Sequence, residues 1–594
     1  MKKLGYLKNI LFNSAILILT FIAVVLIVSS SLLLMHINIS KVSFIVSGVI
    51  TLAVYFLIYR FLRLKKSENT LPENVGGAIL GICVFFISLF VCTQIYDLAH
   101  DSNWYHKAAI GCMANGWNPC YENITEFGSR SKIGIGNLPD CGIWVEHYCK
   151  ASWIFGANVY SITGDIETAK SINILMVYVL FCCAYCILSK YLKSWQSIII
   201  AGLLIFNPII LSQVFSLYID NLLMTTLFVI VLLLADITYK KEFYDVKKIN
   251  FLALFSAIVI CINIKFTGLA YAGIFCFIFY LVWLGFSIKD KNFKKVFIWM
   301  TAFYLVTCIV AIILVGFSSY VKNFVEHGHP LYPLAGEGKV DIMTGNQPSS
   351  FDNMIGVKKL IYSVFSETDN IVGDGRSPKL KVPFRVSEYE KEICKKGADI
   401  RIAGFGPLFS GILCVCAPII LYGLFYLYKK NKEWFCIYLT LLCIIGGMLL
   451  LIQESWWARY SPYFYLVPLM AIMILFSIWN SQGKSELGIT GLGISIVLSA
   501  IIFFNSTYFM DYPINCRKET ITIKENLAKV SEISKSQRVN IKFFTYAYYG
   551  LEFNFRDYGI NYKIVGRTTG KLIPVYGKMA EMEVVYNEEN LLNN

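Results

Sequence analysis

Long apolar stretches follow one another along most of this chain, and they constrain its fold more than any other feature. A helix needs about 20 apolar residues to cross a hydrocarbon core of roughly 30 Å. The chain has 594 residues, 56% of them hydrophobic and only 15% charged, which is too much apolar surface for a soluble globule. We therefore expect a polytopic α-helical membrane protein with about thirteen transmembrane helices. They fall at about 10–35, 42–62, 75–95, 171–189, 197–215, 218–236, 250–264, 268–287, 296–317, 404–428, 434–452, 461–480 and 486–506.

The formal net charge of +14 is explained by where the basic residues lie. Lys and Arg concentrate in the cytoplasmic loops of membrane proteins. If the N-terminus is cytoplasmic, the basic clusters of this chain all fall on the cytoplasmic side. The charge therefore indicates topology, and we expect no nucleic-acid partner. The clusters contain Arg60, Arg63, Lys65, Lys66, Lys190, Lys193, Lys240, Lys241, Lys247, Lys248, Lys289, Lys291, Lys294, Lys295, Lys429, Lys430 and Lys432.

This topology divides the chain into three parts. Residues 1–74 are expected to form a two-helix membrane anchor, and residues 75–506 a transmembrane module that carries the candidate site. Two long polar segments of this module, 97–170 and 318–403, lie outside the cytoplasm in this arrangement. Residues 507–594 form the third part, which is also extracytoplasmic.

The outer tail has a pattern of its own. Residues 538–545 and 562–565 are typical of strands, and a helical pattern at 522–536 precedes them. The tail has roughly 85 residues, which is enough for a modest core. We therefore expect a small C-terminal α/β domain.

Cysteine usage bears on the first outer segment. The chain has 18 cysteines, many of them inside apolar runs where they act as small hydrophobic residues. Cys112, Cys120, Cys141 and Cys149 instead fall in the polar segment 97–170, where one or two disulfides are expected if it is extracytoplasmic. A zinc site is disfavoured because no CxxC pair is present.

Ionisable residues gather where the third apolar stretch leaves the membrane. Asp97, His100, Asp101, Tyr105 and His106 follow it directly. A carboxylate near an apolar boundary is partly desolvated, which raises its pKa, so it can act as a general base for a hydroxyl acceptor. The alternative for Asp101 is a structural one, as the N-cap of the short interfacial helix that follows.

Three further polar groups are predicted at the outer ends of helices. Asp220 opens a helix after an interrupted span, either as a site residue or as an N-cap. Lys265 lies outside, against the positive-inside trend, which indicates an anion partner, although a lysine can also snorkel to lipid headgroups. Arg459 lies among aromatic residues, and arginine binds phosphate bidentately. Trp456 and Trp457 beside it also suit an interfacial aromatic belt.

Together these groups fit one reaction. A carboxylate and two cations at the same outer boundary favour attack by an acceptor hydroxyl on a lipid-linked phosphate ester. The phosphate leaves as an anion without being protonated, so one general base plus electrostatic stabilisation suffices.

These residues resemble the motifs of the GT-C superfamily of integral-membrane glycosyltransferases, which includes protein O-mannosyltransferases and bacterial aminoarabinose transferases of lipid A. The resemblance covers roughly residues 75–480. The acidic pair Asp-Glu of these enzymes is Asp101-Ser102 here, which leaves both Asp97 and Asp101 as candidates for the base and leaves metal binding open. The matching positions are Asp101, Tyr105, Gly116 and Pro119, then Asn207, Pro208 and Asp220, then Lys265 to Gly268, and Arg459 with Tyr460.

The resemblance implies a polyprenyl-phosphate sugar donor, inversion at the anomeric carbon, an extracytoplasmic active site and a location in a bacterial plasma (inner) membrane. The acceptor is then a cell-envelope glycan, lipid or protein, and no cofactor is required. The outer loop with His327, His329 and Tyr332 fits a cover over the donor site, a Pro-fixed loop or a metal-binding His pair.

Two other functions use the same residues. A transporter or flippase of lipid-linked saccharide would hold phosphate with the same cations but need no base. An envelope glycan polymerase or ligase would take a diphosphate-linked donor.

Overall fold

The structure is a computed structural model that describes residues 2–62, 71–131, 142–245, 248–544, 548–566 and 571–584. Among these residues, eleven helices are long and apolar enough to cross a membrane, which confirms the polytopic helical class. They belong to α1 (Lys2–Leu34), α2 (Lys41–Leu62), α3 (Leu71–Gln94), α8 (Ser171–Leu188), α11 (Asp220–Tyr239), α13 (Phe266–Lys289), α14 (Phe293–Cys308), α18 (Phe409–Lys430), α19 (Lys432–Leu451), α20 (Leu466–Gln482) and α21 (Glu486–Thr507).

The predicted count of thirteen is not confirmed, because two of the predicted spans are shorter helices. These are α9 (Ser194–Ile205) and α12 (Ile249–Ile262). The run that contains α9 breaks because Pro208 has no N–H to continue a helix, and it starts α10 (Pro208–Gln213) instead. The Asn207 side chain caps α10 by accepting a hydrogen bond from the Ile210 backbone N–H at 3.1 Å.

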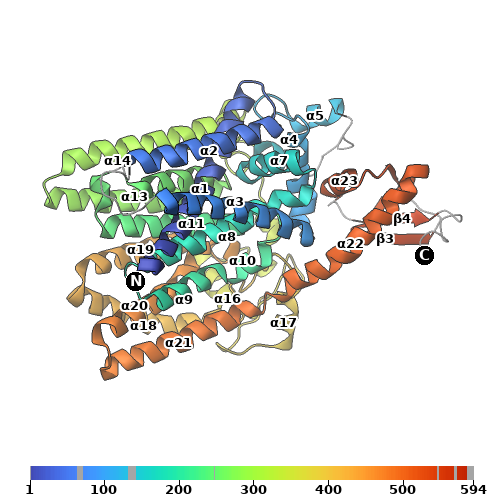
Figure 1. Cartoon of the computed structure of the whole chain (residues 1–594). Helices are drawn as coiled ribbons and strands as arrows, with labels where there is room; N and C mark the ends of the chain where they lie inside the picture. Colours follow the sequence, from blue (N-terminus) through green and yellow to red (C-terminus); the bar gives the residue numbers. More distant parts are fainter. Residues whose placement is uncertain are drawn as a thin grey trace.

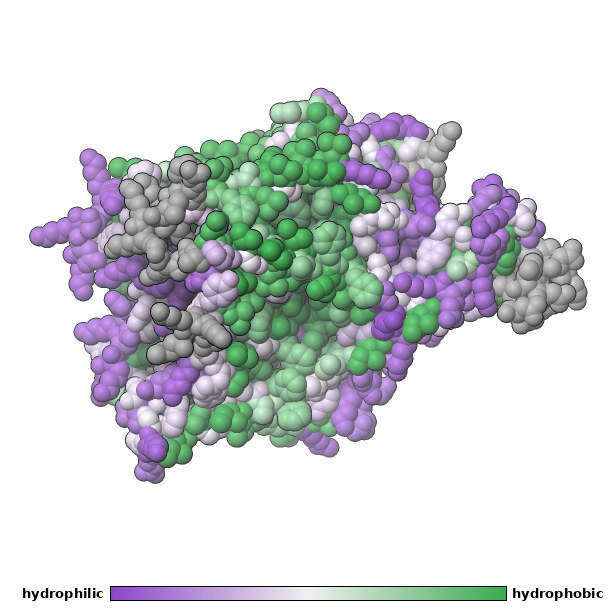
Figure 2. Space-filling view, in the orientation of Figure 1, coloured by the Kyte–Doolittle hydropathy of each residue, from purple (hydrophilic) through white to green (hydrophobic). Residues whose placement is uncertain are grey.

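Hydrophilic residues lie at the two ends of the molecule, and a broad apolar band lies between them (Figure 2). The loops that join α13 to α14, α18 to α19 and α20 to α21 are at one end, and the C-terminal strands are at the other (Figure 1). The α13–α14 and α18–α19 loops, which carry predicted basic residues, therefore lie at the end opposite the C-terminal strands. Of that basic set, Arg63, Lys65, Lys66 and Lys247 are outside the described residues.

The transmembrane helices pack around a central group. Helices α8 and α11 are buried over most of their surface, whereas α2, α3 and α14 each present a broad exposed apolar face. Small residues allow the closest approach, since a Cβ at Gly77 of α3 would lie 2.6 Å from the Cβ of Asn13 in α1. Short helices near the end that carries the C-terminal strands complete this part: α4 (Lys107–Ala114), α5 (Ile124–Arg130), α6 (Gly142–His147), α7 (Ala151–Thr163), α15 (Lys322–His327), α16 (Gly356–Val364) and α17 (Glu388–Cys394).

The C-terminal unit, as we call residues 511–584, has two helices and one sheet within its described residues. Helix α22 (Asp511–Ser536) follows α21 after a three-residue turn, and α23 (Tyr548–Asp557) lies between the first two strands in sequence. The strands are β1 (Val539–Phe543), β2 (Tyr562–Ile564), β3 (Lys571–Tyr576) and β4 (Ala580–Val584), in the spatial order β2-β1-β4-β3. β1 runs parallel to β2 and antiparallel to β4, and β4 runs antiparallel to β3.

An apolar core holds this unit together. It includes Leu527 of α22, Ile541 of β1, Phe555 of α23 and Met582 of β4, all of them nearly inaccessible to solvent. Tyr96, which follows α3, is part of the same cluster. The C-terminal unit therefore packs directly against the segment that leaves the third apolar helix.

Candidate functional site

Four turns that are distant in sequence meet at the end of the membrane helices nearest the C-terminal unit. Asp101 follows α3, Asp220 is the first residue of α11, Lys265 precedes α13 and Arg459 lies in a short turn after α19. A cavity of about 1260 Å³ opens here. Of the residues predicted for the site, Asp101, Tyr105, Lys265, Arg459 and Tyr460 line it.

The turn that carries Lys265 is tight because Gly268 lies against the backbone of α12. A Cβ at Gly268 would be 2.1 Å from the Cys261 carbonyl oxygen, so no larger residue fits without moving the backbone. The turn that carries Arg459 is fixed from α13, where the Tyr271 hydroxyl donates to the Tyr460 carbonyl. Backbone packing and a buried hydrogen bond thus fix the positions of both cations.

Asp220 forms an ion pair with each of the two cations, Lys265 and Arg459. Its carboxylate is completely buried and lies 3.0 Å from Lys265 Nζ and 2.8 Å from Arg459 Nε. Both cations remain partly accessible, at 13% for the Lys265 side chain and 12% for Arg459. The anion partner that the sequence predicted for Lys265 is therefore, in this structure, a carboxylate of the protein itself.

Two more carboxylates complete the ion-pair network around Arg459. Asp101 Oδ2 lies 3.9 Å from Arg459 Nη2, and Asp399 Oδ2 lies 3.2 Å from Arg459 Nη1. Asp399 also accepts a hydrogen bond from the Trp457 ring N–H at 3.0 Å, and Arg401 is 3.8 Å away. Sequence reasoning missed Asp399 and Arg401, which lie at the end of the second long outer segment without any periodic pattern to single them out.

Aromatic rings surround the two cations. Lys265 Nζ lies 3.9 Å from the centre of the Tyr460 ring, and the Arg459 guanidinium lies 5.1 Å from Trp457 and 5.2 Å from Tyr218. Such cation–π contacts are worth about 0.5–2 kcal/mol each. The tryptophan that the sequence also allowed in an interfacial belt is buried beside the site instead, since Trp457 is 3% exposed.

Asp101 is the carboxylate of the first polar stretch that faces the cavity. Burial alone would raise its pKa, as expected for a carboxylate near an apolar boundary, but the hydrogen bond with His100 and the charge of Arg459 outweigh burial. The pKa of Asp101 is therefore lowered from the ordinary 3.8, so the expected rise is wrong for this residue. The side chain makes no capping hydrogen bond, although the residue directly precedes the π-helical turn η1 (Ser102–His106). An ionised, 24% exposed carboxylate at this place can accept a proton from a bound hydroxyl.

Asp97, the other candidate base, has a different environment. Its side chain is 1% exposed, and its two oxygens accept hydrogen bonds from the backbone N–H groups of Ala99 at 2.9 Å and Leu217 at 2.6 Å. Burial raises its pKa, against the lowering effect of the Lys107 charge. In this structure Asp97 shapes the loop and does not line the large cavity.

His106 lies behind the cavity wall. Its ring is buried and its Nδ1 accepts a hydrogen bond from the Trp153 ring N–H at 2.7 Å. Burial lowers the pKa of His106 to about 4, so the ring is neutral at pH 7. It can support the neighbouring Tyr105, whose ring centroid is 4.2 Å away.

The histidine loop lies apart from the cavity lining. His327 stacks on Tyr332 with ring centroids 3.8 Å apart, and His329 Nδ1 accepts from the Leu331 backbone N–H. Within the described ranges, no group of three or more His, Cys, Asp or Glu residues is arranged to hold a metal ion. The predicted roles of this loop as a cover or a metal site remain predictions.

The disulfide prediction for the segment 97–170 is not confirmed at Cys120 or Cys149. Cys120 and Cys149 are free thiols, and the Cys149 thiol lies 3.3 Å from the Tyr320 hydroxyl. Cys141 is outside the described residues.

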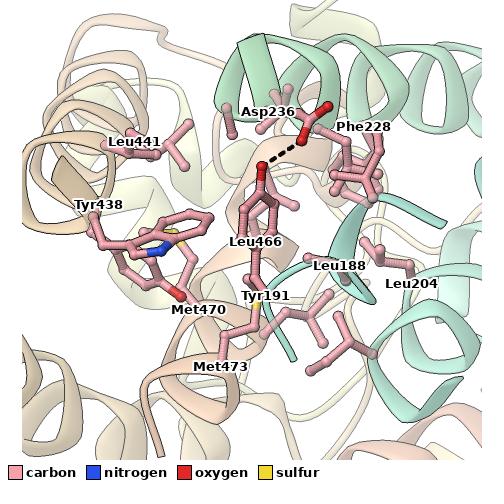
Figure 3. Close-up of a pocket in the computed structure, with 18 residues that line it drawn as sticks. Leu188, Tyr191, Leu204, Phe228, Asp236, Tyr438, Leu441, Leu466, Met470 and Met473 are labelled. Carbon is pink, nitrogen blue, oxygen red and sulfur yellow. Dashed lines mark hydrogen bonds between the residues drawn. The ribbon is translucent and has the colours of Figure 1, made fainter. Parts of the chain in front are cut away.

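A second, much smaller pocket of about 70 Å³ lies between α8, α9, α11, α19 and α20. Figure 3 shows leucine, methionine and aromatic side chains around it, with the Tyr191 hydroxyl donating a hydrogen bond to Asp236. Asp236 also pairs with Lys190 at 2.8 Å and accepts from Asn250 at 2.9 Å. Because its one carboxylate is fully engaged, this pocket offers no group for acid–base chemistry.

Fold and site together define a class: a polytopic helical membrane protein with an ion-paired, aromatic-walled cavity at one end of its membrane helices. No family model matches the chain, and no curated protein matches it. Among solved structures, ArnT from Cupriavidus metallidurans bound to undecaprenyl phosphate is similar, with a TM-score of 0.44, 11% identity and coverage of 83% of this chain and 86% of that chain. ArnT of the same organism in the apo state gives a TM-score of 0.41, 9% identity and the same coverage. These similarities are too distant to assign a function.

Proposed function

We propose that this protein is a membrane glycosyltransferase that moves a sugar from a polyprenyl-phosphate donor to a hydroxyl group of a cell-envelope acceptor. One observation carries the proposal. A single cavity at the end of the membrane helices holds an ionised carboxylate, Asp101, and two partly accessible cations, Lys265 and Arg459. This is the set of groups that the reaction needs, and the motif resemblance supplies the class of donor.

In the proposed reaction, the acceptor oxygen attacks the anomeric carbon on the face opposite the phosphate. Asp101 takes the hydroxyl proton as the new C–O bond forms. The bond between the anomeric carbon and the phosphate oxygen breaks, and its electron pair stays on that oxygen, so the configuration inverts. Lys265 and Arg459 stabilise the negative charge that develops there, which is the role of preorganised cations in a partly desolvated site.

The resting site is electrically balanced, which affects how a donor binds. Asp101, Asp220 and Asp399 face Lys265, Arg401 and Arg459 within a few ångströms. An incoming phosphate therefore competes with carboxylates that are already in place. In this proposal Asp220 keeps its place at both cations. The parts of the Lys265 and Arg459 side chains that remain accessible line the cavity, where a phosphate can accept hydrogen bonds from them.

The direct test uses the full-length protein in native membranes, given a radiolabelled polyprenyl-phosphate sugar. We expect label transfer by the natural chain and a loss of at least about 100-fold in Asp101→Asn, since general base catalysis contributes about 10²–10⁴-fold. Asp374→Asn is the matched control, because Asp374 is an exposed aspartate of the outer segment and does not line the cavity. Transfer by Asp101→Asn at the rate of the control would remove Asp101 from the role of base.

Two other outcomes identify the rival functions. Movement of the labelled lipid between leaflets, without transfer to any acceptor, would identify a flippase. Transfer only from a diphosphate-linked oligosaccharide would identify a polymerase or ligase of envelope glycans.

A further inference from the structure

Three charged side chains are sealed away from water between the first outer segment and the C-terminal unit. Lys107 of α4 and Lys170 are fully buried, and Glu167 between them is 1% exposed. Glu167 Oε1 lies 2.5 Å from Lys107 Nζ, and Lys170 Nζ contacts Glu167 Oε2. The proposed reaction uses none of these three groups.

The C-terminal unit supplies the remaining partners of Glu167. Asn554 of α23 donates a side-chain N–H to Glu167 Oε1 at 3.0 Å, and the Tyr576 hydroxyl at the end of β3 donates to the same oxygen at 3.1 Å. Lys107 Nζ also donates to Asn554 Oδ1 at 3.0 Å. The contact between the C-terminal unit and the membrane part thus includes a buried, hydrogen-bonded ionic centre.

Buried ion pairs are a costly way to gain stability. Removing charges from water costs several kcal/mol per ion, and apolar residues of similar size are often as stable or more stable. Such a centre does, however, accept only one geometry, since each carboxylate oxygen needs its own donors. The effect of this ionic centre is therefore to position the segments that it connects.

The other carboxylate oxygen of Glu167 contacts the loop of residues 97–103, which carries Asp101. Oε2 accepts a hydrogen bond from the Asp97 backbone N–H at 2.9 Å. Asn103 closes the same loop, because its side-chain N–H donates to the carbonyls of Asp97 and Ala99, at 2.9 Å each. Asp101 lies inside this closed loop.

A second contact reaches the loop directly. Gly550 of α23 lies so close to Asn103 that a Cβ there would be 2.4 Å from the Asn103 carbonyl oxygen. The backbone of the C-terminal unit therefore touches the chain two residues from Asp101. Contacts on both sides of Asp101 thus depend on the same unit.

We infer that Asn554 and Tyr576 are positioning residues, which act through Glu167 to hold residues 97–103 so that the Asp101 carboxylate stays beside Arg459. The inference rests on the proposed function for its consequence in catalysis. By this inference the C-terminal unit contributes to catalysis through the position of Asp101, while Asn554 and Tyr576 themselves have no contact with the reacting atoms. A misplacement of about 1 Å can cost about 100-fold in rate, so a loosened loop is expected to slow the chemical step.

The kinetic test compares two hydroxyl deletions within the same unit. Tyr576→Phe removes the hydroxyl that bonds Glu167 and lies 3.4 Å from the Asp97 carbonyl oxygen, and the control Tyr562→Phe removes a hydroxyl that bonds Glu552 inside the unit. We expect Tyr576→Phe to lower kcat about tenfold or more. The KM for the donor should change by less than about twofold, because Lys265 and Arg459, which bind the donor phosphate in the proposed reaction, lie outside this network. In an Asp101→Asn background, the effect of Tyr576→Phe on the residual rate should disappear.

Amide hydrogen exchange tests the inference without an activity measurement, and so it also applies if no sugar transfer is detected. Amide hydrogen exchange of the full chain in lipid nanodiscs should be faster for residues 97–106 in Tyr576→Phe than in Tyr562→Phe. Asn554→Ala provides the second variant if Tyr576→Phe does not fold. Equal exchange of this segment in these variants and the control, or a raised donor KM with unchanged kcat, would overturn the inference. Absence of transfer by the natural chain would instead remove the proposed function.

Discussion

Lys265→Met tests whether this lysine stabilises the donor phosphate or only balances Asp220. At 3.0 Å and an effective dielectric constant of about 20, the attraction between Lys265 and Asp220 is roughly 5–6 kcal/mol before desolvation is subtracted. Loss of the partner of a buried charge costs about 3–5 kcal/mol. Asp220 keeps Arg459 at 2.8 Å in this variant, so we expect a smaller loss of stability, about 1–2 kcal/mol.

The catalytic effect should be much larger than the effect on stability. Removing one donor that stabilises charge in the transition state costs about 10²–10³-fold, or about 2.7–4 kcal/mol. We therefore expect kcat/KM of Lys265→Met to fall by that factor in the labelled-donor assay, while the melting temperature in detergent falls by only a few degrees.

Lys322→Met is the matched control, because Lys322 is also a buried lysine on a carboxylate. It lies 2.7 Å from Glu146 and is 9% exposed, but it does not line the cavity. Among the described residues, Glu146 then keeps the hydrogen bond from the Ile124 backbone N–H and the charge of nearby Lys150 but has no ion pair within 4 Å, so this variant should be the less stable of the two and yet keep its kcat/KM. The reasoning is refuted if Lys265→Met stays within about threefold of the natural chain, or if both variants lose activity in proportion to stability.

Three further predictions follow from other side chains. Because the pKa of Asp101 is lowered from 3.8, the proposed base is ionised throughout the neutral range, so kcat/KM should stay constant from pH 8 down to about pH 5. A fall of kcat/KM on the acid side near neutrality would contradict this assignment. Burial raises the pKa of Asp557 to about 7, so the folded state binds this proton more tightly than the unfolded state does; stability from this group is complete below pH 3.8 and is lost as pH rises toward 7. Asp557→Asn should therefore reduce the fall of the melting temperature between pH 5 and pH 8, and an unchanged slope would count against it. Tyr191→Phe removes the hydroxyl that bonds Asp236 in the small apolar pocket and should cost about 1 kcal/mol of stability without changing transfer, which melting and activity measurements on the same sample can check.

The helical membrane class could be predicted from the sequence because apolar length alone determines it. The meeting of the four turns could be predicted in part for a related reason. Helices that alternate across one membrane bring every second turn to the same plane, so Asp101, Asp220, Lys265 and Arg459 were expected on one side. Their distances within that plane depend on helix packing, which hydropathy does not encode.

Other features needed contacts between distant parts of the chain. Asp399 acquires its place from Trp457 and Arg459, about 60 residues further on. Likewise, Glu167 lies near the end of the polar segment 97–170, and nothing near it in sequence indicates that Tyr576 completes its environment.

Local chemistry explains the errors in the secondary structure. The break at Pro208 divides a stretch that hydropathy predicted as one span. In the tail, the regions of β1, β2 and part of α22 were recognised, whereas β3 and β4 were not, because Pro574 and Gly577 interrupt the alternation that marks a strand.

Asp220 has one more consequence, for the end of a catalytic cycle. A site with two bare cations would bind its phosphate product tightly and release it slowly. Here a carboxylate stays 3.0 Å from Lys265 and 2.8 Å from Arg459, so the departing lipid phosphate leaves cations whose charge the protein already partly neutralises. If the proposed reaction is correct, this internal counter-ion weakens product retention and lets the enzyme turn over, at the expense of some donor affinity.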